Sequence, residues 1–155
     1  ICEMAAHEKE KGKTLFEKLI ELYVKYGFYK EGLISITKKG MDGQQQIAAM
    51  MQGYRENPPK EIAGKKVISL MDYDTSKGIN PQTGEEWAIN LPKSNVLQFV
   101  TEDGSLISAR PSGTEPKIKF YFSVKENLNS AEQFDEVNQK LDDKINDIIV
   151  SMNLK

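Results

Sequence analysis

The stretch that decides the fold is residues 95–124, NVLQFVTEDGSLISARPSGTEPKIKFYFSV. Its last part, residues 118–124, has Ile, Phe, Phe and Val at every second position, with Lys, Tyr and Ser between them. This period of two predicts a strand with one buried face. An Asp-Gly turn at 102–105 separates the apolar segments 95–101 and 106–109, which is a strong hairpin signal. The stretch therefore predicts an antiparallel sheet.

Helical patterns lie on both sides of this stretch. Thr14, followed by Glu17 three positions later, forms a capping box before an apolar helix face that ends at Gly27. We predict further helices at 1–11, from Asp42 until Pro58, and from Ser130 to Met152, and strands at 33–37 and 67–73. The predicted class is α+β, a mainly antiparallel sheet covered by helices, with an N-terminal helical appendage.

Residues 74–93 form a long polar segment with Gly and Pro and one tryptophan, Trp87. Loops of this length are often functional or mobile. The simpler interpretation is that Trp87 buries its ring and fixes the segment to the rest of the domain.

The composition excludes several classes of function. The 155 residues include 21 Lys and Arg and 23 Asp and Glu, so the net charge of −2 disfavours nucleic-acid binding. The single Cys2 and single His7 exclude an internal disulfide, a cysteine metal cluster and His-rich zinc sites. The chain has no apolar run of about 18 residues and no signal-peptide pattern. We therefore expect no membrane partner and a cytoplasmic location, and a start at Ile1 suggests a piece of a longer chain.

The segment suited to chemistry is residues 110–119, RPSGTEPKIK. It offers the guanidinium of Arg110, the hydroxyls of Ser112 and Thr114, and close backbone approach at Gly113. Period-two geometry places Lys117 and Lys119 on the face opposite Ile118 and Phe120. These are the donors that a phosphate group needs when it leaves water.

Two interpretations of this segment remain open on physical grounds. Three cations (Arg110, Lys117, Lys119) against one carboxylate (Glu115) give it a charge of +2 in a negatively charged chain, which favours anion binding. A Pro-Ser-Gly-Thr sequence is also typical of an ordinary turn with exposed charges.

The segment RPSGTEPKIKFY, preceded by LPKSNVLQF and EDGSLISA, resembles the C-terminal domain of the α-D-phosphohexomutases, in particular the phosphoglucomutase and phosphopentomutase branch. The resemblance implies that residues 33–155 are the fourth, phosphate-binding domain, which is similar in fold to the TATA-box-binding protein. Residues 1–32 would then be the helical tail of the third domain plus a linker.

By position, the resemblance assigns contacts with the substrate phosphate to Arg110, Ser112, Gly113, Thr114 and Lys119. Lys117 is a weaker candidate, on charge alone. Glu115 is expected to organise the loop, because a carboxylate facing phosphate would repel it.

Members of this family also have three catalytic loops outside the phosphate-binding segment. Family members use a phosphoserine in a Ser-His loop, a Mg²⁺ held by an Asp-Gly-Asp loop and a Gly-Glu-Glu type loop that contacts the sugar. We find none of these three loops here, so we expect no catalytic residue, metal site or cofactor in this chain, with Mg²⁺ bound elsewhere in the parent enzyme. Asp72 and Asp74 are interpreted as carboxylates at a strand end.

These features lead to two hypotheses about function. The first is a C-terminal fragment of a phosphoglucomutase- or phosphomannomutase-like enzyme, an isomerase that transfers a phosphoryl group within a hexose or pentose phosphate, for example from glucose 1-phosphate to glucose 6-phosphate. The fragment would hold the phosphate that is not transferred, would be inactive alone, and would have the upstream domains as partners. The second hypothesis is a free-standing phosphate-binding or protein-interaction module.

Overall fold

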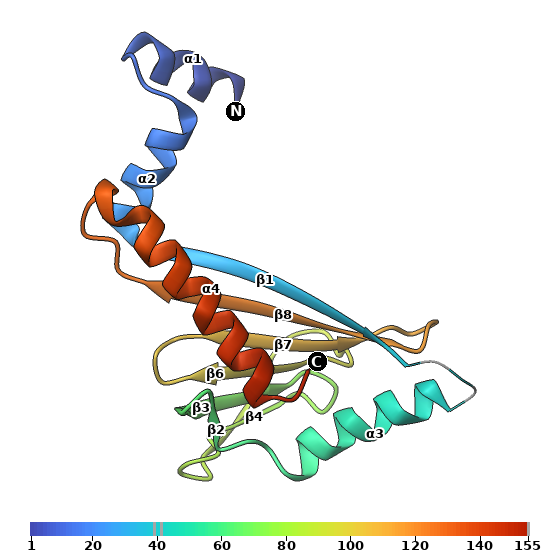
Figure 1. Ribbon diagram of the computed structural model, residues 1–155. Helices are drawn as coiled ribbons and strands as arrows, with labels where there is room; N and C mark the ends of the chain where they lie inside the picture. The colour runs from blue at the N-terminus through green and yellow to red at the C-terminus, as the bar shows by residue number, and fades with distance from the viewer. Residues whose placement is uncertain (39, 41, 155) are drawn as a thin grey trace. The chain divides into compact units, whose positions relative to one another are not determined.

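The structure, a computed structural model, describes residues 1–38, 40 and 42–154 and has the α+β composition that the sequence predicts. The helices are α1 (Cys2–Glu10), α2 (Leu15–Tyr26), α3 (Gly43–Glu56) and α4 (Phe134–Ser151), with a 3₁₀ turn η1 (Ala131–Gln133) before the last (Figure 1). The strands are β1 (Phe28–Thr37), β2 (Glu61–Ile62), β3 (Lys65–Asp72), β4 (Lys77–Ile79), β5 (Glu86–Ala88), β6 (Leu97–Thr101), β7 (Leu106–Pro111) and β8 (Lys117–Glu126).

The strands form one sheet in the order β1-β8-β7-β6-β3-β4-β5, with β2 paired to β3. The successive pairs from β8 to β5 are all antiparallel. The predicted hairpin at 102–105 joins β6 and β7, with Gly104 at a φ of 79°. Such a positive φ explains the glycine, because other residues avoid this region.

Two compact units can be distinguished, Ile1–Lys30 with Lys125–Asp143 and Glu31–Val124 with Lys144–Lys155. In the smaller unit, aromatic rings supply much of the packing. Phe28 stacks between Tyr23 and Phe134, with ring centroids 4.2 and 5.2 Å away. Lys30 forms an ion pair of 2.6 Å with Asp142.

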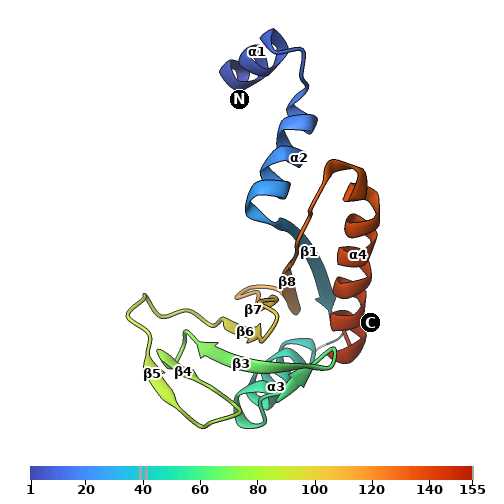
Figure 2. The same ribbon diagram turned by 90° about the vertical axis from the view of Figure 1, so that its left-hand side faces the viewer.

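In the larger unit, one face of the sheet carries the core. The buried side chains of this face are Val67, Leu70, Leu97, Phe99, Ile107, Ala109, Ile118, Phe120, Phe122 and Val124. Helix α3 covers this face, because its Tyr54 ring packs edge-on against Phe99 and Phe120 at 5.5 and 6.5 Å (Figures 1 and 2). Helix α4 packs against Gly32 of β1, because a Cβ added at Gly32 would lie 3.2 Å from the side-chain carbons of Ile145. The other face of the sheet is therefore left for polar side chains.

Local signals explain most of these elements. The capping box at Thr14 is complete, with the Thr14 side chain accepting from Glu17 N–H and the Glu17 side chain accepting from Thr14 N–H. Asp42 and Ser130 occupy the predicted N-cap positions, but neither side chain makes a capping hydrogen bond. Strand β1 begins at Phe28, five positions before the predicted 33–37.

The polar segment 74–93 is not a plain loop, because it contains β4 and β5. Trp87 is 38% exposed, so the prediction that its ring is buried was wrong. The ring instead covers Gly78, its partner on the neighbouring strand. None of the described helices has the length and apolar content needed to cross a membrane.

Candidate functional site

Strands β7 and β8 bring the cations of segment 110–119 together. Arg110 and Lys119 are directly opposite each other in the strand pairing, and Ile118 and Phe120 are fully buried on the other face. The predicted alternation, with Lys117 and Lys119 away from the core, is confirmed. Two like charges that face each other across a strand pair repel and cost stability.

Within the part of the chain that the structure describes, no carboxylate neutralises the charges of Arg110 and Lys119. Among the described residues, neither Arg110 nor Lys119 forms an ion pair, whereas Lys117 Nζ lies 3.4 Å from Glu115 Oε2. The arrangement therefore leaves two cationic side chains available on the polar face of the sheet.

The loop between the strands is held by its own hydrogen bonds. Ser112 N–H donates to the Lys117 carbonyl at 2.8 Å, and Lys117 N–H donates to the Glu115 carbonyl at 2.7 Å. Ser112 Oγ accepts from the backbone N–H groups of Thr114 and Glu115 at 3.4 and 3.2 Å. Because the oxygen is the acceptor in both bonds, the hydroxyl hydrogen of Ser112 remains available for a ligand.

The end of the loop contacts the segment after β1 and the start of helix α3. Lys38 N–H donates to the Pro116 carbonyl at 2.9 Å. A Cβ added at Gly43, the first residue of α3, would lie 2.4 Å from the Lys38 carbonyl oxygen and 2.9 Å from Pro116 Cβ. Only glycine fits this contact, so the start of α3 packs directly against the end of the loop.

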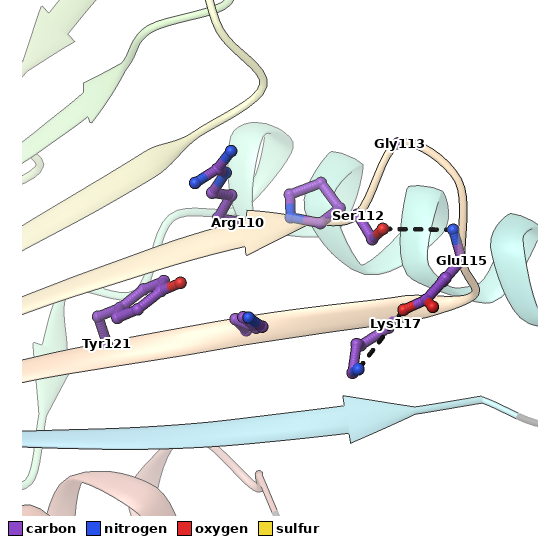
Figure 3. Close-up of a pocket in the computed structure, with 8 residues that line it drawn as sticks. Arg110, Ser112, Gly113, Glu115, Lys117 and Tyr121 are labelled. Carbon is purple, nitrogen blue, oxygen red and sulfur yellow. Dashed lines mark hydrogen bonds and ion pairs between the residues drawn. The ribbon is translucent and has the colours of Figure 1, made fainter.

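A hollow of about 270 Å³ lies above the two strands and the loop (Figure 3). It is lined by Arg110, Pro111, Ser112, Gly113, Glu115, Lys117, Lys119 and Tyr121. Five of the six predicted site residues thus line one hollow. The sixth, Thr114, is exposed and does not line it.

Sequence reasoning did not include Pro111 or Tyr121 in the site and gave Glu115 only an organising role. Tyr121 is on the same strand face as Lys119, two positions on, so strand periodicity could have identified it. Glu115 also lines the hollow, and its carboxylate forms the ion pair with Lys117.

Comparison with known proteins identifies the family. Residues 48–143 match the family described as phosphoglucomutase/phosphomannomutase, C-terminal domain. The chain belongs to this family.

Curated relatives of the chain are named phosphoglucomutase and are longer than this chain. The chain is 41% identical over 133 residues to phosphoglucomutase of Staphylococcus haemolyticus (strain JCSC1435), covering 86% of this chain and 23% of that protein. It is 41% identical over 141 residues to phosphoglucomutase of Staphylococcus aureus (strain USA300), covering 91% and 24%. The chain therefore spans about a quarter of the length of these relatives.

A solved structure, the open form of the exocytosis-sensitive phosphoprotein pp63/parafusin, a phosphoglucomutase from Paramecium, aligns with a TM-score of 0.46 and 17% identity. The alignment covers 84% of this chain and 22% of that one.

In this phosphoglucomutase/phosphomannomutase C-terminal domain, Asp72 and Asp74 lie at the end of β3, as predicted. Asp72 binds Arg55 through two hydrogen bonds, of 3.0 and 3.3 Å, and accepts from Thr75 Oγ1 at 2.9 Å. Burial raises the pKa of the Asp72 carboxyl, but these hydrogen bonds outweigh it and hold the pKa below its ordinary value. The carboxylate is therefore used to anchor the β3–β4 turn to α3.

A metal site was not expected in this chain. Within residues 1–38, 40 and 42–154, no cluster of three or more His, Cys, Asp or Glu side chains could hold an ion. The prediction that the chain has no Gly-Glu-Glu triplet was wrong, because one occurs at 84–86. It stands at the turn between β4 and β5, and Glu86 pairs with Lys77 at 3.9 Å.

Proposed function

We propose that this chain is the C-terminal part of a phosphoglucomutase-like enzyme and that its hollow holds the phosphate of a sugar phosphate that is not being transferred. The observation that carries the proposal is the facing pair Arg110 and Lys119, for which no ion pair is found among the described residues. Facing cations destabilise a folded chain, and a bound dianion would remove the repulsion.

The lining residues supply suitable donors for such an anion. The Arg110 guanidinium can bind two phosphate oxygens at once, and Lys119 contributes a point charge. The Ser112 hydroxyl donates while its oxygen accepts loop N–H groups, which polarises the O–H. Charge-assisted hydrogen bonds contribute roughly 1.5–3 kcal/mol each, so a few of them suffice to hold a phosphomonoester.

The chemistry of phosphoryl transfer belongs, in this proposal, to parts of the parent enzyme beyond this chain. The chain spans about a quarter of its curated relatives, and the phosphoserine, the Mg²⁺ ligands and the sugar-contacting loop are expected in the remainder. The chain alone is therefore predicted to be inactive. Cytoplasmic location also stays a prediction.

The direct test is a titration of the ¹⁵N-labelled chain with inorganic phosphate, followed by NMR. We expect amide shifts confined to residues 110–119 and their loss in Arg110→Ala. Shifts spread over the whole chain, or unchanged in the variant, would contradict the assigned site. In the parent enzyme, Arg110→Ala should lower kcat/KM, and an unchanged value would count against the phosphate role.

The hypothesis of a free-standing module predicts a different start of the coding sequence. A coding sequence that begins directly before Ile1 would favour it, whereas an open reading frame that extends several hundred codons upstream would favour the enzyme. Mutase activity of the isolated chain at the level of an intact enzyme would contradict both hypotheses.

A further inference from the structure

The polar face of the sheet continues beyond the facing cations. The next row along the strands consists of Ser108 of β7 and Tyr121 of β8, which are paired in the strand register. Each lies two positions from a cation of the site, Ser108 from Arg110 and Tyr121 from Lys119, so all four side chains share one face. Adjacent rows on one face are about 7 Å apart, roughly the distance from the phosphorus atom of a hexose phosphate to the hydroxyl groups on the far side of the sugar ring.

A chain of hydrogen bonds, in which each side chain donates to the next, ends at Ser108. Tyr73 O–H donates to Gln98 Oε1 at 3.1 Å, and Gln98 Nε2 donates to Ser108 Oγ at 3.0 Å. Because Ser108 Oγ is the acceptor here, its own hydrogen is the last donor of the chain. No described residue accepts a hydrogen bond from it. Ser108 is on the sheet face that carries the hollow, beside the hollow and not in its lining, so its polarised hydroxyl is left for a ligand that extends beyond the hollow on this face.

Tyr121 provides the second hydroxyl of this row. Its side chain lines the hollow, and the residue is 36% exposed. Figure 3 shows its phenol ring lying along β8 with the hydroxyl directed toward the loop end of the strands. Among the described residues the hydroxyl has no hydrogen-bond partner. A phenol hydroxyl can both donate and accept, which matches the hydroxyl group of a polyol.

The size of the hollow allows a ligand larger than phosphate. Its volume of about 270 Å³ is roughly nine times the 30 Å³ share of one water molecule. A phosphate group has five heavy atoms, so with the phosphate at Arg110 and Lys119 the part next to Tyr121 has room for several more atoms.

We propose that Ser108 and Tyr121 form a subsite that binds the hydroxyl-bearing carbon skeleton of a phosphate monoester. This inference rests on the proposed phosphate site one row away and extends it. The subsite distinguishes a sugar phosphate from a phosphate ester without hydroxyl groups, because only the former gives both hydroxyls a partner.

The experiment compares two monoesters of equal charge, glucose 1-phosphate and methyl phosphate, by NMR titration of the chain. We expect the unmodified chain to bind glucose 1-phosphate about 4- to 100-fold more tightly, since each of the two neutral hydrogen bonds contributes roughly 2- to 10-fold in affinity. Tyr121→Phe and Ser108→Ala should each weaken the binding of glucose 1-phosphate more than that of methyl phosphate, and so lower this ratio. The control is Tyr26→Phe, an exposed tyrosine of α2 that does not line the hollow.

The outcomes separate the two proposals. A ratio near one in the unmodified chain, or a ratio unchanged by both variants, overturns the subsite but leaves the phosphate site in place. Equal losses for both monoesters in Tyr121→Phe would also overturn it, since they indicate a general effect on the site. If methyl phosphate causes no shifts at residues 110–119, the proposed function fails and the subsite fails with it. Thermal unfolding of each variant checks that the fold is retained.

Discussion

At the scale of single residues, the proposed role of Lys119 in phosphate binding opposes stability. Lys119 faces Arg110 across the β7–β8 pair, and no carboxylate pairs with it among the described residues. Binding sites commonly retain such unfavourable arrangements, because the ligand removes the repulsion only when it binds.

We expect Lys119→Gln to weaken phosphate binding by about tenfold or more, as the loss of one charge-assisted hydrogen bond requires. The melting temperature should stay the same or rise by about 1–3 °C, because the like-charge repulsion is removed. Calorimetric titration and thermal unfolding measure the two effects. Lys93→Gln, at an exposed lysine outside the hollow, serves as the control. A marked fall in melting temperature would show that Lys119 has a structural role.

Glu115 has the opposite charge in the same hollow. Its carboxylate pairs with Lys117 at 3.4 Å and would lie near a bound dianion. Glu115→Gln should therefore raise the affinity for inorganic phosphate by about two- to fivefold, with the larger effect at low ionic strength. Titrations at two salt concentrations measure this. Weaker binding would instead support the sequence prediction that Glu115 organises the loop.

At the scale of elements, the β4–β5 hairpin includes a close contact between Gly78 and the Trp87 ring. A Cβ added at Gly78 would lie 2.1 Å from Trp87 Cε2. This distance is shorter than any van der Waals contact, so the ring would have to move. We expect Gly78→Ala to displace the Trp87 ring and to destabilise the chain by about 1–3 kcal/mol. Tryptophan fluorescence and denaturant unfolding report the two changes.

A second glycine offers a matched control for Gly78→Ala. A Cβ added at Gly53, inside α3, meets no atom within 4 Å. Gly53→Ala should therefore stabilise the chain, by about 0.5–1 kcal/mol, without a change in fluorescence. Equal effects of both substitutions would contradict the role of the Trp87 contact.

Much of the fold could be predicted because the signals are local. The alternation at 118–124 predicts a strand and its buried face, and the Thr14 capping box predicts the start of α2. Strands β4 and β5 were missed because three residues are too few to show a period. Their pairing brings Trp87 over Gly78, a contact between positions nine residues apart.

The candidate site was predictable in part for the same reason. The cations of 110–119 stand out in composition, and five of the six proposed residues line one hollow. Ser108 and Tyr121 were missed because the alternation of apolar and polar residues shows only which face of a strand is buried. It does not show which residues of the polar face take part in a site. The importance of these two residues comes from the strand register and from the chain of hydrogen bonds that starts at Tyr73. Neither can be read from one strand alone.

At the scale of the whole molecule, Asp103 connects the β6–β7 hairpin to helix α4. Its carboxylate pairs with Lys144 at 2.7 Å and accepts from Thr101 Oγ1 and from Ser105 N–H at 2.6 and 3.2 Å. Burial raises the pKa of Asp103, but these partners outweigh it and hold the pKa well below its ordinary value. The folded state therefore favours the ionised carboxylate more than the unfolded state does.

The sign of the pH dependence follows. The stabilisation by Asp103 is fully present above its ordinary pKa of about 4 and is lost as the pH falls toward the lowered folded pKa. We expect Asp103→Asn to destabilise the chain by about 1–3 kcal/mol at pH 7, with a smaller difference at pH 3. Urea unfolding at several pH values measures this, with exposed Asp147→Asn as the control. A difference independent of pH would exclude the ion pair as its cause.

The short strand β5 also affects how the chain behaves beside other copies of itself. It is the edge strand at one end of the sheet and has only three residues. Its Glu86 forms an ion pair with Lys77 of the neighbouring strand β4. A strand from another molecule would find few free backbone N–H and C=O groups here and would have to approach charged side chains. Short, charged edge strands are one way in which natural sheets avoid edge-to-edge aggregation. This end of the sheet is therefore a poor template for fibril growth at high protein concentration.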